Sequence, residues 1–198
     1  MENQSPVVYF VIPCYNEEAV LPETVKRLTE KLDSMREKGL ASPESRMLLV
    51  DDGSRDATWS LISGFHEKNP YVEGVKLAHN RGHQNALLCG LMTARESCDC
   101  AISLDADLQD DTGVLDQFVE KYLEGCDVVY GVRNKRDTDT WFKRTTAEGF
   151  YKVMKVLGVD VVFNHADYRL MSRRALEALS EYRETNLFLR GIVPLIGY

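Results

Sequence analysis

The sequence predicts an α/β fold with a mostly parallel central sheet flanked by helices. Short runs of β-branched and aromatic residues alternate with longer segments whose apolar residues recur at helical spacing. Polar clusters follow the strand-forming runs, and in sheets of this kind ligands bind beyond the carboxyl ends of the strands. The 198 residues are expected to form a single domain, residues 1–198, with a sizeable core.

The individual elements follow from local patterns. Five short apolar runs predict strands at 7–12, 47–50, 72–77, 100–104 and 127–132. Four amphipathic segments predict helices at 23–38, 57–68, 84–95 and 115–123. Pro13 is expected to close the first strand, and Asp56 is a plausible N-cap for the second helix. Five polar clusters, including Arg133 after the fifth strand, should then meet at one edge of the sheet.

Composition excludes several classes of protein. The net charge of −7 argues against a general nucleic-acid-binding protein, and 44% hydrophobic with 28% charged residues argues against disorder. The odd count of five cysteines does not favour a disulfide framework, and the polar start of the chain lacks the pattern of a signal peptide. Residues 187–198 are mostly apolar, so we expect a truncated chain whose missing C-terminal segment is membrane-associated.

Three oxygen-bearing side chains follow the fourth predicted strand. Asp105, Asp107 and Gln109 lie at positions i, i+2 and i+4, which share one face of an extended chain. Hard oxygen ligands suit Mg²⁺ or Mn²⁺, and an ion held there could neutralise a diphosphate. The alternative is an acid-rich helix N-terminus, because Asp110 and Asp111 follow.

A second acidic cluster, Asp51-Asp52-Gly53-Ser54, follows the second predicted strand. A carboxylate here could accept hydrogen bonds from a nucleotide base and a ribose hydroxyl. Taken alone, the pattern favours a turn and helix cap in which Gly53 supplies an unusual backbone conformation.

Taken together, these motifs resemble those of family 2 glycosyltransferases in order and spacing. The matching segments are Pro13-Cys14-Tyr15-Asn16-Glu17-Glu18, Asp51-Asp52-Gly53-Ser54, Asn80-Arg81-Gly82 with Ala86, Gly90 and Leu91, and Asp105-Ala106-Asp107-Leu108-Gln109-Asp110. Later segments resemble the branch of dolichyl-phosphate mannosyltransferases and bacterial polyprenyl-phosphate glycosyltransferases. They are Gly131-Val132-Arg133, Lys143-Arg144 with Ala147, His165-Ala166-Asp167-Tyr168-Arg169-Leu170 and Phe188-Leu189-Arg190-Gly191.

The resemblance implies a GT-A (Rossmann-like) fold and an inverting transfer of sugar from a nucleoside diphosphate to a polyprenyl phosphate. A UDP-sugar is favoured as donor, with GDP-mannose as the second candidate. The residues implied to bind the donor are Pro13, Tyr15, Glu17, Asp51, Asp105 and Arg133. Those implied to hold Mg²⁺ or Mn²⁺ are Asp105, Asp107 and Gln109. Arg144 and Arg169 are candidates for binding the acceptor phosphate.

The charge that develops on the leaving diphosphate explains why a cation and Arg133 belong in such a site. Asp167 is the candidate base if the acceptor is a hydroxyl. If the acceptor is a phosphate, it is already ionised and Asp167 would orient a substrate instead. Asp167 could also be a purely structural partner of Arg169.

The segment 133–144 carries five basic residues and Trp141-Phe142. It is expected to close over phosphates or contact anionic headgroups, unless it is an ordinary solvated loop. His79 and His83 have i, i+4 spacing, but the simpler interpretation places one in a loop and the other at a helix start.

The expected location is the cytoplasmic face of the membrane, with membrane surface, donor and lipid acceptor as partners, no nucleic acid, and a homo-oligomer left open. The alternatives are a family 2 transferase acting on a saccharide or protein hydroxyl, and a non-catalytic scaffold that binds nucleotide sugars.

Overall fold

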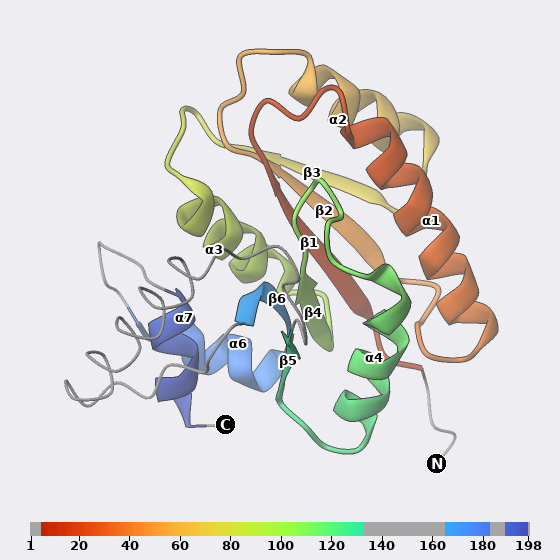
Figure 1. Ribbon diagram of the computed structural model, residues 1–198, viewed down its shortest axis with the longest axis vertical. Coiled ribbons are helices and arrows are strands. Elements are labelled where there is room, and N and C mark those ends of the chain that lie inside the picture. The colour runs from red at the N-terminus through yellow and green to blue at the C-terminus, as the bar shows by residue number, and fades with distance from the viewer. Residues whose placement is uncertain (1–4, 133–164, 183–188, 198) are drawn as a thin grey trace, which may run out of the picture.

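A six-stranded sheet in the order β3-β2-β1-β4-β6-β5 forms the centre of the chain (Figure 1). The structure is a computed structural model and describes residues 5–132, 165–182 and 189–197. The strands are β1 (Val8–Cys14), β2 (Arg46–Asp51), β3 (Val72–Lys76), β4 (Cys100–Ser103), β5 (Val128–Val132) and β6 (His165–Ser172). The helices are α1 (Leu21–Glu37), α2 (Thr58–Lys68), α3 (His83–Ala94), α4 (Leu115–Leu123), α6 (Arg173–Leu179) and α7 (Leu189–Ile192), with 3₁₀ turns η1 (Thr112–Val114) and η2 (Val193–Ile196).

Strand directions confirm the expected mostly parallel sheet. β1 pairs in parallel with β2 and β4, and β2 pairs in parallel with β3. β6 is antiparallel to both of its neighbours, β4 and β5. Because β6 runs in the opposite direction, its first half lies beside the carboxyl end of β4, where Arg169 pairs with Ser103. This reversal brings Asp167 to the edge where the parallel strands end.

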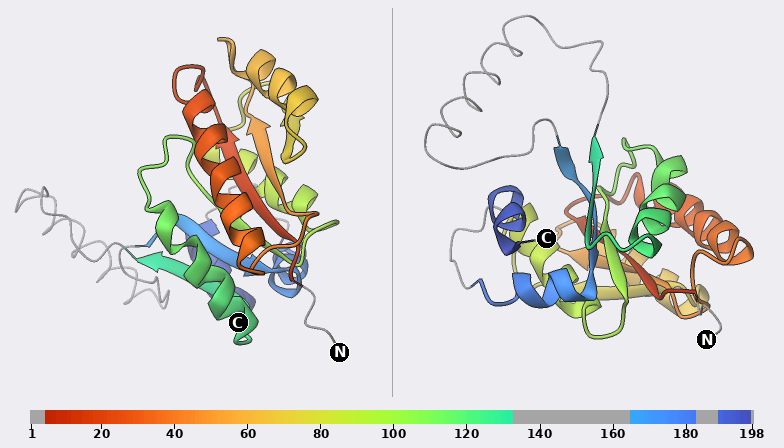
Figure 2. Two further views of the ribbon diagram at one scale, coloured as in Figure 1. Left: turned by 90° about the vertical axis from the view of Figure 1, so that its right-hand side faces the viewer. Right: turned by 90° about the horizontal axis from the view of Figure 1, so that it is seen from below.

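Both faces of the sheet are covered by helices, which explains why the inner strands β1, β2 and β4 are almost continuously apolar. One core cluster packs α1, α2 and α4 on one face, and a second packs α3, α6 and α7 on the other. The right-hand view of Figure 2 shows α1 and α4 on one side of the sheet and the blue helices α6 and α7 on the other. Gly90 of α3 packs so closely on the sheet that an added Cβ would lie 2.4 Å from Val11 Cγ1.

All five predicted strands and four predicted helices are present, with ends shifted by at most two residues; α4 begins and ends as predicted. Pro13 does not close β1, which continues to Cys14. The backbone N–H and C=O positions of residues 11 and 13 point toward β4, and the pairing of β4 with β1 ends at Val11. The N–H that Pro13 lacks would therefore have made no bond within the sheet. β6, α6 and α7 were not predicted.

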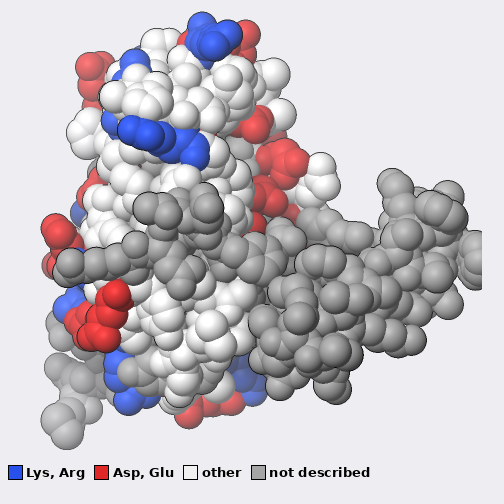
Figure 3. Space-filling view, turned by 90° about the vertical axis from the view of Figure 1, so that its left-hand side faces the viewer, with Lys and Arg blue, Asp and Glu red and all other residues white. Residues whose placement is uncertain are grey.

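Among the described residues, no helix is both long and apolar enough to cross a bilayer. The face shown in Figure 3 has Lys and Arg in separate groups among Asp and Glu, without a continuous basic surface over its described part. That distribution agrees with the net charge of −7.

Candidate functional site

The loops that follow β1 and β2 are bonded to each other at the carboxyl edge of the sheet. The backbone N–H of Asn16 donates to Ser54 Oγ at 2.9 Å, and Asn16 Oδ1 accepts from the backbone N–H of Arg55 at 2.9 Å. Asn16 has a φ of 56°, a left-handed conformation that asparagine tolerates better than most residues. The Tyr15–Glu17 segment is therefore held directly over the acidic cluster that follows β2.

The loops after β2 and β3 are joined by the carboxylate of Asp52. Its two oxygens accept the backbone N–H groups of Arg81 at 2.6 Å and Gly82 at 2.9 Å. Gly53, in the loop after β2, has a φ of 68°. A Cβ at this position would lie 2.6 Å from backbone atoms of His79 and Asn80 in the loop after β3. The expectation that Gly53 supplies an unusual backbone conformation is confirmed.

Asp51 lies fully buried at the last position of β2. Its Oδ1 accepts the backbone N–H of Ser54 at 3.2 Å, whereas Oδ2 has no hydrogen-bond partner among the described residues. A buried carboxylate oxygen without a partner is costly, because the group has given up water without a replacement. An N–H or O–H donor from a ligand would remove that cost.

The sequence interpretation assumed that the Asp105–Gln109 segment is extended, but in the structure this segment turns after β4. The backbone N–H of Leu108 donates to Asp105 O at 3.2 Å, and Leu108 has a φ of 47°, unusual for a bulky residue. Ala106 and Leu108 are buried, whereas Asp107 and Gln109 are exposed and Asp105 is half-buried. The three polar residues thus still alternate with buried ones.

Acidic side chains at this edge disfavour each other's charged forms. The pKa of Glu17 is raised above its usual value by burial and by the nearby charges of Asp107, Asp56 and Asp105. The pKa of Asp105 is also raised, chiefly by burial, although His83 opposes that shift. Negative charge is therefore concentrated where a cation would lower both pKa values.

The residue types after β4 fit a divalent cation. Gln109 Nε2 donates to Asp107 Oδ2 at 2.8 Å, so a carboxylate and a carboxamide already contact each other. Within the described residues no group of three or more His, Cys, Asp or Glu is arranged to hold a metal. That finding is compatible with Mg²⁺, which keeps several waters and is commonly bound by one or two carboxylates together with substrate phosphates.

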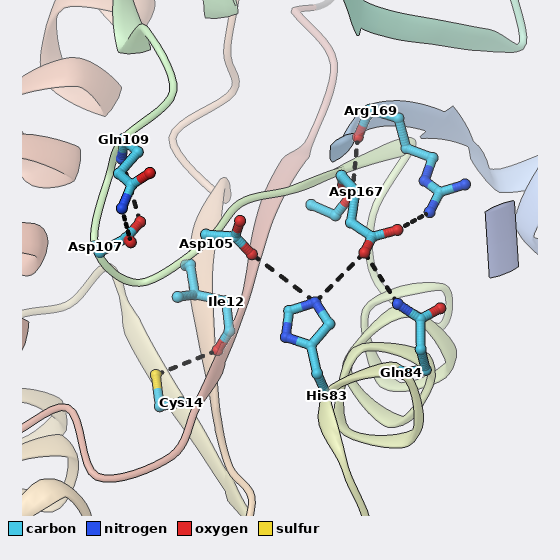
Figure 4. A network of polar contacts seen from close by, with 10 residues as sticks. Ile12, Cys14, His83, Gln84, Asp105, Asp107, Gln109, Asp167 and Arg169 are labelled. Atoms are coloured by element: carbon cyan, nitrogen blue, oxygen red, sulfur yellow. Dashed lines mark hydrogen bonds and ion pairs between the residues drawn. The ribbon is translucent and has the colours of Figure 1, made fainter. Parts of the chain in front are cut away.

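Asp167 is held from three directions (Figure 4). Its Oδ1 accepts Arg169 Nη2 at 2.6 Å, and its Oδ2 accepts Gln84 Nε2 at 2.9 Å. His83 Nε2 lies 3.6 Å from Asp167 Oδ2 and 3.8 Å from Asp105 Oδ1, so the imidazole stands between the two carboxylates. The end of β4, the start of α3 and the reversed strand β6 thereby meet at one point.

The structure brings most of the predicted site residues to this edge. Pro13, Tyr15, Glu17, Asp51, Asp105, Asp107 and Gln109 all follow or end the parallel strands, and Asp167 joins them from β6. Arg169 is only 1% exposed and contacts Asp167. This contact is the one expected if Asp167 is a structural partner of Arg169. Arg133, Arg144 and the basic segment 133–144 lie outside the described residues.

Two residues of this network belong to the polar cluster expected after the third strand, residues 80–84, but their contacts with the acidic residues were not predicted. His83 was interpreted only as the start of a helix, which is where it lies, but it also faces Asp105 and Asp167. Gln84, the next residue of α3, was given no role. The available signal was their place in that cluster, at the start of a helix that begins at the same edge of the sheet.

A comparison with protein families identifies the family to which this chain belongs. The family model described as "Glycosyl transferase family 2" matches residues 9–180. The chain belongs to glycosyltransferase family 2. The match spans β1 to α6, and therefore includes every described acidic residue of the candidate site.

Individual relatives are also named as glycosyltransferases. The chain is 55% identical over 198 residues to the glycosyltransferase YkoT of Bacillus subtilis (strain 168), covering 100% of this chain and 59% of the relative. It is 36% identical over 191 residues to the bactoprenol glucosyl transferase of Shigella phage SfV, covering 96% of this chain and 60% of that protein. The chain therefore spans about three fifths of the length of these relatives.

Solved glycosyltransferases share the GT-A fold. A mannosyltransferase from Pyrobaculum calidifontis, solved with GDP-Man and Mn²⁺, matches with a TM-score of 0.58 and 23% identity, over 89% of this chain and 47% of that one. Glucosyl-3-phosphoglycerate synthase from Mycobacterium tuberculosis, solved with UDP, matches with a TM-score of 0.58 and 20% identity, over 87% and 59% of the two chains. The expected fold class is confirmed.

Proposed function

We propose that this family 2 glycosyltransferase moves a hexosyl group, with glucose as the first candidate, from a nucleoside diphosphate to a polyprenyl phosphate. The observation that carries the proposal is the placement of Asp167 across the carboxyl edge from Asp105, with His83 between them. One edge thus holds carboxylates suited to a donor and a separate, rigidly held carboxylate on the other side of His83, and the choice of a phosphate as acceptor rests on the named relatives. The name of the phage relative supports both the glucosyl group and the lipid carrier.

On the donor side, the buried Asp51 would accept an N–H or O–H of the nucleoside through the oxygen that lacks a partner among the described residues. Tyr15 is 40% exposed and directly follows Cys14, the register partner of Asp51, and its ring would cover the base. Asp105 and Asp107, with Gln109, would hold Mg²⁺ or Mn²⁺ against the diphosphate. The bound cation supplies neutralisation of the charge on the leaving group.

On the acceptor side, a phosphate oxygen would attack C1 of the sugar on the face opposite the diphosphate. A new bond forms between the phosphate oxygen and C1 as the bond between C1 and the diphosphate oxygen breaks. The electron pair of the broken bond leaves with the nucleoside diphosphate. Because a phosphate monoester is already ionised near neutral pH, no base is required, and Asp167 would orient the sugar or the acceptor. Arg133 and Arg144 remain candidates for phosphate contacts, whereas Arg169 is 1% exposed and pairs with Asp167.

A lipid acceptor places the reaction at the membrane surface, and a water-soluble nucleotide sugar places it on the cytoplasmic face. The basic segment 133–144, with Trp141 and Phe142, is the candidate for contact with anionic headgroups.

The acceptor is tested by following radiolabelled glucose from UDP-glucose with Mn²⁺ into the organic phase, with either undecaprenyl phosphate or undecaprenol in detergent. We expect label to be extracted with the phosphate and not with the alcohol, and Asp167→Asn to lower the rate at least about tenfold. Transfer to the alcohol or to a saccharide instead would identify a hydroxyl transferase with Asp167 as base. Donor binding without transfer to any acceptor, by this chain and by a protein of the full length of its relatives, would favour a non-catalytic scaffold.

A further inference from the structure

The side chain of Gln84 bridges two segments that are distant in the sequence. Its Nε2 donates to Asp167 Oδ2 at 2.9 Å, and its Oε1 accepts the backbone N–H of Leu189 at 3.2 Å. Asp167 belongs to β6, and Leu189 is the first residue of α7. One carboxamide therefore links the candidate acceptor-side carboxylate to the C-terminal part of the described chain.

Chemistry fixes which way this carboxamide points. An ionised carboxylate only accepts hydrogen bonds, so it must face the NH₂ group of Gln84. A backbone N–H only donates, so it must face the carboxamide oxygen. Glutamate at this position would satisfy Leu189 but would place a second negative charge against Asp167. An apolar side chain would satisfy neither.

Both ends of the bridge rest on buried structure. The Asp167 side chain is 7% exposed, and its other oxygen is held by Arg169. Leu189 is fully buried, and with Ile192 and Val193 it packs into the core cluster that α3 shares. Since Gln84 lies in the first turn of α3, a shift of α7 relative to α3 would be transmitted to the Asp167 carboxylate through a single side chain.

We propose that Gln84 is a positioning residue that holds the Asp167 carboxylate for the acceptor and makes that orientation depend on the docking of the segment Leu189–Ile196. The inference rests on the proposed function, because it gives Gln84 its effect through Asp167. Gln84 acts on turnover and not on donor affinity, since its two partners, Asp167 and Leu189, are not among the candidate donor residues.

Three variants separate the two ends of the bridge. Gln84→Glu keeps the acceptor for Leu189 and loses the donor for Asp167. Gln84→Met keeps the length of the side chain and loses both. Asn85→Asp is the matched control, because it adds the same charge one residue later in α3, where the Asn85 side chain is exposed and bonds only the backbone oxygen of Arg81 in the described structure.

Two readouts are needed. Hydrogen exchange of the amides at 189–193 reports the docking of α7, without any substrate. Steady-state transfer from UDP-glucose to undecaprenyl phosphate gives kcat and the KM of each substrate.

We expect exchange at 189–193 to accelerate in Gln84→Met and to stay near wild type in Gln84→Glu and Asn85→Asp. We expect kcat to fall about tenfold in both Gln84 variants, the effect of one lost hydrogen bond to a charged group, while the KM for UDP-glucose stays within about twofold. The fall in kcat caused by Gln84→Glu should become smaller at lower pH, because the protonated carboxyl of the introduced glutamate again offers an O–H donor to Asp167.

Unchanged exchange in Gln84→Met would overturn the link to α7, and wild-type kcat in both Gln84 variants would overturn the positioning role. A wild-type chain that binds neither UDP-glucose nor GDP-mannose and transfers sugar from neither refutes the proposed function and the positioning role with it. The exchange result then still decides whether Gln84 holds α7, so the two failures are distinguishable.

Discussion

Replacing Asp167 by alanine is expected to lower the free energy of unfolding by about 3–5 kcal/mol, because it removes the carboxylate paired with a buried guanidinium. Arg169 is 1% exposed, and its Nη2 lies 2.6 Å from Asp167 Oδ1. Losing one partner of such a pair takes away the counter-charge that lies 2.6 Å from a charge held in the interior. For a chain of this length the loss corresponds to a fall in Tm of about 6–20 °C.

Denaturant unfolding of a matched variant shows how much of this loss of stability is due to the burial of the pair, because the variant loses an exposed ion pair instead. Glu124→Ala breaks the Lys121–Glu124 pair, which has the same 2.6 Å separation but side chains 55% and 59% exposed. Its effect should stay within about 1 kcal/mol. Asp167→Asn, which keeps an oxygen for Arg169 but not the charge, should fall between the two. Equal losses for Asp167→Ala and Glu124→Ala would contradict the buried pair.

Gly53→Ala is expected to destabilise the fold by about 2–5 kcal/mol, combining about 1–2 kcal/mol for a left-handed backbone with about 1–3 kcal/mol of overpacking. The added Cβ would lie 2.6 Å from the backbone of His79 and Asn80, which cannot move aside as a flexible side chain could. The loop it would displace is bonded to Asp52, so nucleotide binding should weaken as well.

Gly39→Ala is the control for the backbone contribution. Gly39 has almost the same positive φ, of 70°, but a Cβ there would meet only Ser5 Oγ, at 3.9 Å. Thermal unfolding should show a clearly smaller loss for Gly39→Ala than for Gly53→Ala. Losses of the same size would mean that the close approach of the two loops does not contribute.

Local patterns were sufficient for the parallel half of the fold. Runs such as 47–50 are apolar because both faces of the sheet are covered, and α4 has its apolar residues at helical spacing. β6 was not predicted because Asp167 and Arg169 interrupt its apolar residues, and their burial is stabilised by a mutual contact that the sequence does not reveal. The extension of β1 through Pro13 likewise depends on where a neighbouring strand stops pairing, which no local pattern records.

The candidate site divides in the same way. The clusters at Asp51 and Asp105 were recognisable because each directly follows an apolar strand. His83 and Gln84 were not, because their partners are Asp105, Asp167 and Leu189, which are brought near only by the reversed strand β6 and the docking of α7. A residue whose role depends on two remote partners has no signature in its own neighbourhood.

Thermal unfolding with a panel of nucleotide sugars, each with and without Mn²⁺ or Mg²⁺, tests most directly whether the carboxyl edge binds the donor. A donor at 100 times its Kd should add about 2.7 kcal/mol, a rise in Tm of about 5–11 °C. We expect this rise with one uridine or guanosine donor, only when metal is present, and not in Asp107→Ala. Because Asp107 is exposed, that variant should unfold near the wild-type temperature without ligand. No rise with any donor, or a full rise in Asp107→Ala, would contradict the donor site proposed here.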